Sequence, residues 1–433
     1  MSAQAVAVVE PRVGARQKQA LAGAWLVSAA TLGSGVLTYA FHVLAARTLG
    51  ADAYGKVAVL WAAMFLAAVV LYRPVEQTIS RALADRMTRG EEVRSVLRTG
   101  GLAGAAAIVL PVAAVLAGRN LVGDRLFEGD RSLATMLAVG IALYGVAYFG
   151  RGVFGGMRWF PGYATALLAD TAGRFLLAVP LVVVASTSLA AASVSVGGIA
   201  GILLPAVVGR ARRRRLVAPT KGEPFALAAA ARFAAPAALI AAADQLLVNG
   251  GPLLVVVLNS GSNASKTAGV VFAATMLVRV PVFVFQGLAA SLLPNLTHLH
   301  ANGDVARFRR AVASSACVFL GIGVVIVAGA AAIGPEALRT VYGPGFEAGR
   351  GPLALLGAGV GCYLAASTLS QALLARASTA RAARAWAVTA AVFVGLYAAA
   401  PGAPLLRIAI AFSSAALVSL VLLAAGLARE VRR

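Results

Sequence analysis

Long apolar segments separated by short polar connections run along almost the whole chain. A helix needs about 20 mostly apolar residues to cross roughly 30 Å of hydrocarbon, and twelve segments are about that long. They lack the alternation of barrel strands, so the pattern predicts an all-α polytopic membrane protein with about 12 transmembrane helices. The predicted spans are 21–46, 57–80, 99–118, 132–150, 163–185, 189–208, 232–258, 268–293, 311–333, 352–374, 383–400 and 405–427.

A long polar connection, residues 209–231, divides the predicted spans into two sets of six. Both sets would start from the same face of the membrane, which predicts two parallel six-helix lobes, residues 1–215 and 216–433. A weak repeat supports this division. The segment ADAYGKVAVL (51–60) leads into the second span, and SKTAGVVFAA (265–274) leads into the eighth, about half the chain later.

The composition agrees with a membrane protein, since 60% of the residues are hydrophobic and only 12% are charged. The formal net charge of +22 is unevenly placed, because most of the 38 lysines and arginines fall in connections on one side. This asymmetry predicts cytoplasmic N- and C-termini, with the first span retained as an uncleaved helix. The basic run RARRRR (210–215) is therefore interpreted first as a topology signal and second as a contact with anionic membrane lipids. Nucleic acid is not expected as a partner.

Six ionisable residues fall inside the predicted spans, where a charge costs several kcal/mol. They are Arg73, Glu76, Asp170, Arg174, Asp244 and Arg279. Arg73 lies about 12 Å along its helix from Arg81 at the cytoplasmic side, so it could reach the surface by snorkelling. It could also pair with Glu76, three positions on, or meet a charged cargo.

The other four residues differ in depth. Asp170 and Arg174 have i,i+4 spacing, which places them on one helix face as a possible self-neutralising pair. Asp244 and Arg279 lie too deep to reach water unaided, so they must face each other, a polar cavity, or both. We favour Arg279 as a cavity residue over a purely structural Asp244–Arg279 pair.

Signals for an enzyme are weak. The loops contain neither a DxD cluster nor a Walker A sequence, and His298 and His300 have no third metal ligand nearby in the sequence. We therefore expect no enzyme activity, metal or cofactor. The two cysteines, Cys317 and Cys362, fall in apolar spans and are interpreted as packing residues.

Four patches at the ends of predicted spans occur in a definite order. They are ARTLGADAYG with Leu49-Gly50 and Tyr54-Gly55; RGVFGGMRW (151–159); Asp244-Gln-Leu-Leu with Gly269 and LLPNLTHLHANGD (292–304); and VYGPGFEAG (341–349) with LSQALLA (369–375). In this order they resemble the polysaccharide flippase branch of the MOP exporter superfamily (multidrug/oligosaccharidyl-lipid/polysaccharide). The resemblance covers nearly the whole chain in topology.

This resemblance implies two six-helix lobes that form a V around a central cavity and alternate between inward- and outward-open states. Members of the family flip undecaprenyl-pyrophosphate-linked oligosaccharides across the bacterial cytoplasmic membrane, and related lipid II flippases use cavity arginines for the pyrophosphate. The resemblance implies substrate binding by Arg279 and Arg73. We expect Glu76, Asp170 and Arg174 to bind substrate with them. The resemblance also implies functional partners among polysaccharide polymerases and glycosyltransferases.

One departure concerns ion coupling. Some relatives bind a cation near carboxylates of the seventh and eleventh spans, and Asp244 fits the first position. The eleventh span offers only Thr389 and no carboxylate. Sodium coupling is therefore disfavoured, while proton coupling, coupling to the membrane potential and downhill transport stay open. The alternatives for the function are a multidrug or cation antiporter of the same superfamily, a membrane glycosyltransferase or ligase, and a scaffold subunit without transport activity.

Overall fold

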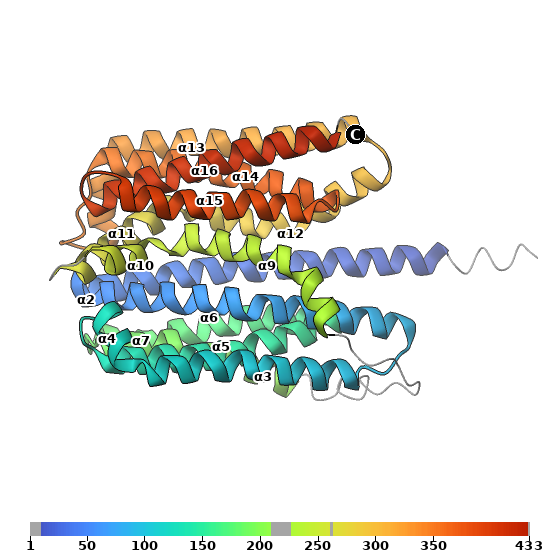
Figure 1. Cartoon of the computed structure of the whole chain (residues 1–433), viewed down its shortest axis with the longest axis horizontal. Coiled ribbons are helices and arrows are strands. Elements are labelled where there is room, and N and C mark those ends of the chain that lie inside the picture. Colours follow the sequence, from blue (N-terminus) through green and yellow to red (C-terminus); the bar gives the residue numbers. More distant parts are fainter. Residues whose placement is uncertain (1–9, 209–226, 260–262, 432–433) are drawn as a thin grey trace, which may run out of the picture.

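The computed structural model describes residues 10–208, 227–259 and 263–431, and its regular elements are helices (Figure 1). In the first part of the chain they are α2 (Glu10–Arg89), α3 (Arg94–Ala117), α4 (Arg119–Leu126), α5 (Arg131–Gly156), α6 (Phe160–Ala178), the 3-10 helix η1 (Val179–Val182), α7 (Thr187–Val196) and α8 (Gly198–Val208). In the second part they are α9 (Leu227–Asn249), α10 (Gly251–Leu258), α11 (Ala264–Val278), α12 (Val280–Ala301), α13 (Val305–Tyr342), α14 (Arg350–Ala375), α15 (Thr379–Ala399) and α16 (Pro404–Val431).

The helices follow the predicted spans closely, and the all-α multi-span fold is confirmed. In the described residues, eight helices are individually long and apolar enough to cross a membrane, and the bent pair α9–α10 can count as a ninth. Helix α2 contains the first two spans, because the chain folds back at Gly50, whose φ of 73° favours glycine. The predicted sixth and eighth spans are each divided between two helices, α7–α8 and α11–α12.

Two of the breaks matter for the site. Helices α9 and α10 meet at a bend of 72° around Gly250. Helix α11 ends at Val278, and Arg279 lies between it and α12, which starts with Pro281 in its first turn. A proline near the start of a helix is tolerated because its missing N–H has no partner there. Arg279 therefore occupies a break in the middle of a span.

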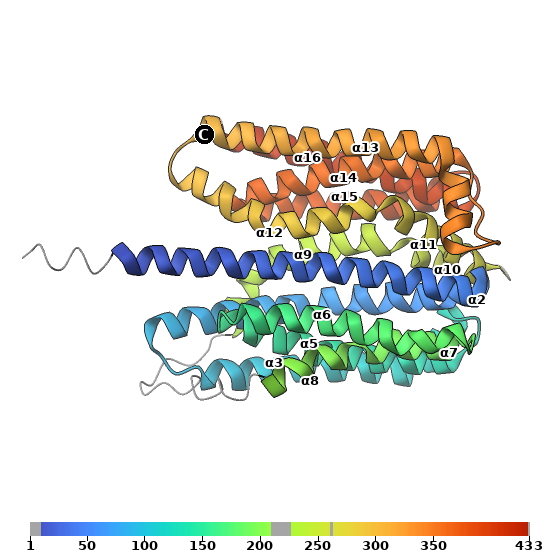
Figure 2. The same cartoon turned by 180° about the vertical axis from the view of Figure 1, so that it is seen from behind.

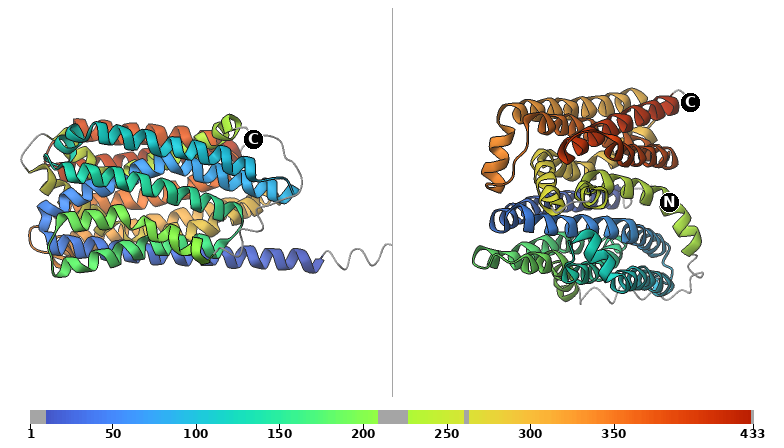
Figure 3. Two further views of the ribbon diagram at one scale, coloured as in Figure 1. Left: turned by 90° about the horizontal axis from the view of Figure 1, so that it is seen from below. Right: turned by 60° about the vertical axis from the view of Figure 1, so that its left-hand side comes forward.

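The helices form two lobes, as expected (Figures 1 and 2). Helices α3 to α8 gather on one side and α13 to α16 on the other, with α2, α9 and α12 between them. The further views in Figure 3 show the same division from two more directions. The predicted boundary between residues 215 and 216, and the basic run 210–215, fall in residues 209–226, outside the described part, so both interpretations stay predictions.

The lobes touch closely at one end of the bundle, which we call the Gly50 end; the opposite end, near both termini, is the termini end (Figure 1). A Cβ added to Gly55 of α2 would lie 1.8 Å from the carbonyl oxygen of Ser265, and one added to Gly269 would lie 2.3 Å from that of Ala51. Only glycine permits such an approach. Gly55 and Gly269 occupy the same position of the repeat seen in the sequence, and their mutual contact supports two related halves.

Polar contacts add to this closure. The carboxylate of Glu128, in the loop before α5, accepts a hydrogen bond from the backbone N–H of Ser265 at 3.2 Å and lies 3.3 Å from Lys56 Nζ. Partial burial opposes ionisation of Glu128, but Ser265 and Lys56 outweigh it and lower its pKa. Nearby, Arg47 Nε donates to the carbonyl of Val341 at 2.9 Å.

Candidate functional site

A cavity of about 270 Å³ lies between the lobes. Its walls come from both halves of α2, from α5, α6 and α9, and from the break between α11 and α12. Its charged lining residues in the described part of the chain are Arg73, Arg151, Asp170, Arg174 and Arg279. Four of the five residues predicted to bind substrate therefore line the same cavity as Arg151, which the sequence did not single out.

Asp170 and Arg174 form the pair that their spacing predicted. Arg174 Nη2 lies 2.9 Å from Asp170 Oδ1, and Tyr144 of α5 donates its hydroxyl to the same oxygen at 2.9 Å. The guanidinium carbon of Arg174 also lies 4.6 Å from the ring centroid of Trp61. Arg174 is only 2% exposed, so its positive charge is buried. The carboxylate of Asp170 and the face of the Trp61 ring compensate this charge.

Arg279 is 5% exposed and has incomplete hydrogen bonding. Its Nη2 donates weakly to Asn249 Oδ1 at 3.4 Å, while Nε and Nη1 are buried without a partner among the described residues. The Asp244–Arg279 pair, which was the alternative to a cavity role, does not form in this structure. Asp244 instead accepts a hydrogen bond from the hydroxyl of Tyr363 on α14 at 2.5 Å, which leaves the guanidinium of Arg279 for the cavity.

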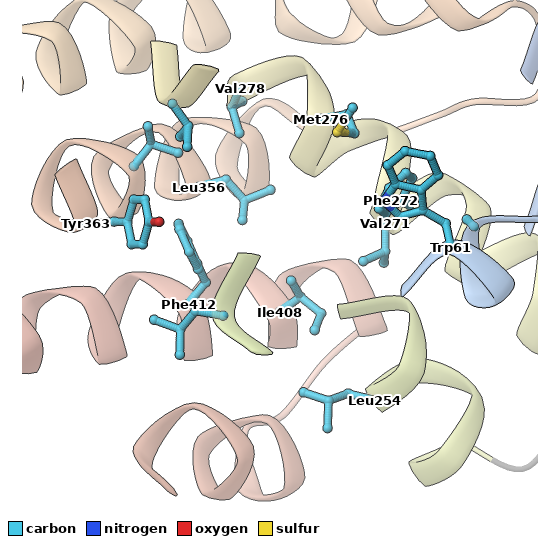
Figure 4. Close-up of a cluster of buried hydrophobic side chains, with 14 of the residues drawn as sticks. Trp61, Leu254, Val271, Phe272, Met276, Val278, Leu356, Tyr363, Ile408 and Phe412 are labelled. Atoms are coloured by element: carbon cyan, nitrogen blue, oxygen red, sulfur yellow. The ribbon is translucent and has the colours of Figure 1, made fainter. Parts of the chain in front are cut away.

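The carboxylate of Asp244 contacts α14 of the C-terminal lobe. Its partner Tyr363 lies beside Phe412, with ring centroids 6.3 Å apart, and both are drawn in Figure 4. Thr389 of α15 donates to the carbonyl of Ala385 in its own helix. The assignment of Asp244 to ion coupling stays a prediction.

Arg151 is the cavity residue that sequence reasoning missed. The fourth span was expected to end at residue 150, which placed Arg151 in a cytoplasmic connection, but α5 continues to Gly156. Arg151 is 8% exposed, and its Nε and Nη2 have no partner within the described chain. Its guanidinium carbon lies 3.9 Å from the ring centroid of Tyr148. The spacing of Tyr144, Tyr148 and Arg151 places them on one helix face, which was the signal available.

The Arg73–Glu76 pair, one of the possibilities that their spacing left open, is not formed in this structure. Glu76 is buried and accepts a hydrogen bond from the hydroxyl of Tyr163 at 2.8 Å, whereas Arg73 is exposed. Arg73 lines both the central cavity and a second cavity of about 490 Å³, which also contains Glu76, Arg81 and Tyr163. The two cavities therefore meet at Arg73, and the second continues toward the termini end.

The central cavity is strongly cationic. Four arginines line it against one carboxylate, and that carboxylate already pairs with Arg174. Arg151, Arg174 and Arg279 each retain at least one buried guanidinium nitrogen without a partner in the described chain. Buried donors without partners are costly, so this arrangement suits an anion that accepts several hydrogen bonds at once. Phosphate oxygens have this property, whereas a cationic cargo would be repelled.

Two mycobacterial proteins are similar to this chain in sequence. No family model matches the chain. Uncharacterized protein Rv1510 of Mycobacterium tuberculosis is 28% identical over 341 residues, which cover 76% of this chain and 74% of that protein. Uncharacterized protein Mb3654 of Mycobacterium bovis is 26% identical over 336 residues, with the same coverage.

Solved structures match over almost the full length. An inward-facing conformation of a multidrug resistance MATE family transporter of the MOP superfamily aligns with a TM-score of 0.73 at 13% identity, covering 92% of this chain and 94% of that chain. The chain has the MOP-transporter fold. An outward-facing conformation of a MATE transporter aligns less well, with a TM-score of 0.62 at 14% identity and 95% coverage of both chains.

A third solved structure also matches this fold. It is a MOP superfamily transporter from Pyrococcus furiosus Vc1, for which a reverse polarity of the binding pocket suggests a different function. It aligns with a TM-score of 0.62 at 13% identity, and 95% of each chain is covered.

Proposed function

We propose that this protein is a transporter that flips a lipid-linked oligosaccharide, with the sugar attached to undecaprenyl through pyrophosphate, from the cytoplasmic to the outer leaflet of the bacterial cytoplasmic membrane. The observation that carries the proposal is the set of buried arginines with unpartnered guanidinium nitrogens, Arg151, Arg174 and Arg279, in one cavity between the lobes. Arginine stays charged at any physiological pH and binds phosphate oxygens in a bidentate manner.

The two cavities supply a path for such a cargo. A pyrophosphate entering from the termini end would first meet Arg73, where the two cavities join, and then Arg151, Arg174 and Arg279. Glu76 is held by Tyr163, so it does not compete for Arg73. Opening of the Gly50 end would then expose the head group to the other side, which is alternating access, while the tail stays in lipid.

The alternative of a multidrug or cation antiporter is less well supported. Its cavity should be acidic, whereas the central cavity here has four arginines and one paired carboxylate among its described lining residues. A glycosyltransferase or ligase is also disfavoured, because the fold is that of transporters. Asp244, hydrogen-bonded to Tyr363, remains our candidate for ion coupling.

The proposed cargo implies functional neighbours. Glycosyltransferases would build the oligosaccharide on the cytoplasmic side, and a polysaccharide polymerase would extend it outside. Anionic lipids would contact the basic connections on the cytoplasmic face, in line with the proposed orientation of both termini.

The test is flipping of a fluorescent polyprenyl-pyrophosphate sugar in proteoliposomes. Replacement of Arg151 or Arg279 by Gln should slow flipping about 10- to 100-fold, because a hydrogen bond to a charged group contributes about 1.5–3 kcal/mol. The double variant Arg73→Ala with Arg279→Ala should abolish flipping.

The matched control is Arg350→Gln, because Arg350 is exposed and pairs with Glu336 outside the cavity. It should flip at the parent rate. Parent-like flipping by the double variant would overturn the proposed site. Resistance of cells to cationic dyes on overexpression, without flipping of the sugar lipid, would favour the antiporter.

A further inference from the structure

His42 is a fully buried titratable residue that the proposed cargo site does not use. It lies on the first half of α2, one helical turn beyond the cavity residue Thr38, toward the Gly50 end. Its Nδ1 lies 3.2 Å from the hydroxyl of Tyr54, while its Nε2 is buried without a hydrogen-bond partner in the described chain. Buried polar atoms without partners are rare and point to a state in which the partner is present.

Aromatic rings from both lobes enclose His42. Trp61 of α2 approaches it with ring centroids 4.4 Å apart, and Phe272 of α11 approaches it from the other lobe at 4.8 Å. Figure 4 shows Trp61 on α2 near Phe272 on α11. Trp61 also lines the cavity, so His42 lies in the layer that separates the cavity from the Gly50 end. When the lobes part at that end, Phe272 must move away from the imidazole.

The charged groups that act on His42 are both cationic. Arg174 approaches from α6 and Arg279 from the break after α11, and each disfavours a second positive charge nearby. The titratable group in contact is the Tyr54 hydroxyl, which can donate to or accept from a neutral ring. In the closed arrangement the imidazole is therefore shielded from water, with a hydroxyl as its hydrogen-bond partner and two arginines nearby.

We infer that His42 binds a proton when the lobes separate at the Gly50 end, so that protonation of this residue drives the outward-open state. Water then reaches Nε2, and a hydrated imidazole titrates near pH 6.5. The open state binds one more proton than the closed state, so acidification favours opening, by at most about tenfold per pH unit below that value. The inference rests on the proposed transport: a proton would be the ligand that binds at each opening of the transport cycle.

The experiment measures opening directly and needs no cargo. Spin labels at Asp124→Cys and Glu347→Cys, exposed positions of the two lobes at the Gly50 end, report their separation in a Cys317→Ala/Cys362→Ala background. In the parent, the fraction of molecules with the longer label-to-label distance should increase as the pH falls from 8 to 5.5, with a midpoint near 6.5. His42→Gln and His42→Phe, which cannot bind the proton, should keep the short distance over the whole range.

The chain offers a strong control, because it has only three histidines. The double variant His298→Gln/His300→Gln changes the other two, which are exposed at the termini end, and should respond to pH like the parent. Glu128 responds to acid only below its ordinary pKa of 4.5, outside the range used. His42→Phe keeps an aromatic ring in the cluster, so it serves if His42→Gln fails to fold.

A pH response that persists in the folded His42 variants would overturn the inference, as would a parent distance that does not change with pH. Neither result depends on flipping of a sugar lipid. A protein that opens with pH but does not flip the lipid would support His42 and contradict the proposed cargo, so the two failures are distinguishable.

Discussion

At the scale of single residues, the buried charges differ in how well they are compensated. Arg174 has Asp170, Tyr144 and the face of Trp61, whereas Arg279 has only a long hydrogen bond to Asn249 and a contact with Met276. Arg174 is therefore fixed by its protein partners alone, and a bound anion would stabilise Arg279 more than Arg174. The Asp170–Arg174 pair is a fixed part of the cavity wall.

Asp170→Asn should destabilise the protein markedly. Removal of one partner from a buried ion pair leaves an uncompensated charge, at a cost of about 3–5 kcal/mol. The measurement is the apparent melting temperature in detergent. Glu336→Gln breaks the exposed pair with Arg350 and should change it little. Equal melting temperatures for Asp170→Asn and the parent would show that the pair has no structural role.

At the scale of elements, the sequence predicted the spans well and their breaks poorly. The length of an apolar run fixes where a helix can cross the membrane, and each predicted span has a helix or helix pair. The break at Arg279 lies two residues before Pro281, which cannot supply a backbone N–H to a continuous helix. The i,i+4 pair Asp170–Arg174 was predictable from its spacing, but the partners of Glu76, Asp244 and Arg279 were not. Those partners lie on other helices.

The crossing of α2 and α11 allows a test of closure. In Gly55→Ala the new methyl group would meet the backbone of Ser265, so the two helices must separate. We expect a larger fraction of molecules open at the Gly50 end, because overpacking costs the closed state about 1–3 kcal/mol. The spin-label distance described for His42 measures it at pH 8.

Gly321→Ala on α13 is the control for this substitution. A Cβ at Gly321 meets nothing within 4 Å among its described surroundings, so the distance should match the parent. An unchanged distance in Gly55→Ala would contradict the assignment of this crossing as the contact that limits opening.

At the scale of the whole molecule, the two lobes meet at the Gly50 end while the cavities continue toward the termini end. Glu128 adds a polar link across the lobes, because its carboxylate accepts the N–H of Ser265. The link depends on charge and is therefore sensitive to both substitution and acid.

Glu128→Gln should weaken closure at neutral pH, by less than about 1 kcal/mol because the group is partly solvated. The folded-state pKa of Glu128 is lowered, so its contribution is present above the ordinary value of 4.5 and is lost as the pH falls through the lowered pKa. The same spin-label pair should show a modest rise in the open fraction at pH 7. Asp52→Asn, at an exposed carboxylate of the same end, is the control. An equal rise in both variants would point to general charge rather than to this link.

The size of the central cavity has a consequence for selectivity. At about 30 Å³ per water molecule, 270 Å³ corresponds to roughly nine waters, comparable with a diphosphate and part of one sugar ring. The remaining sugars would travel in water beyond the walls. Under the proposed function, the protein would therefore accept glycans of different length and sequence on a common carrier, and the choice of polymer would belong to the enzymes that assemble it.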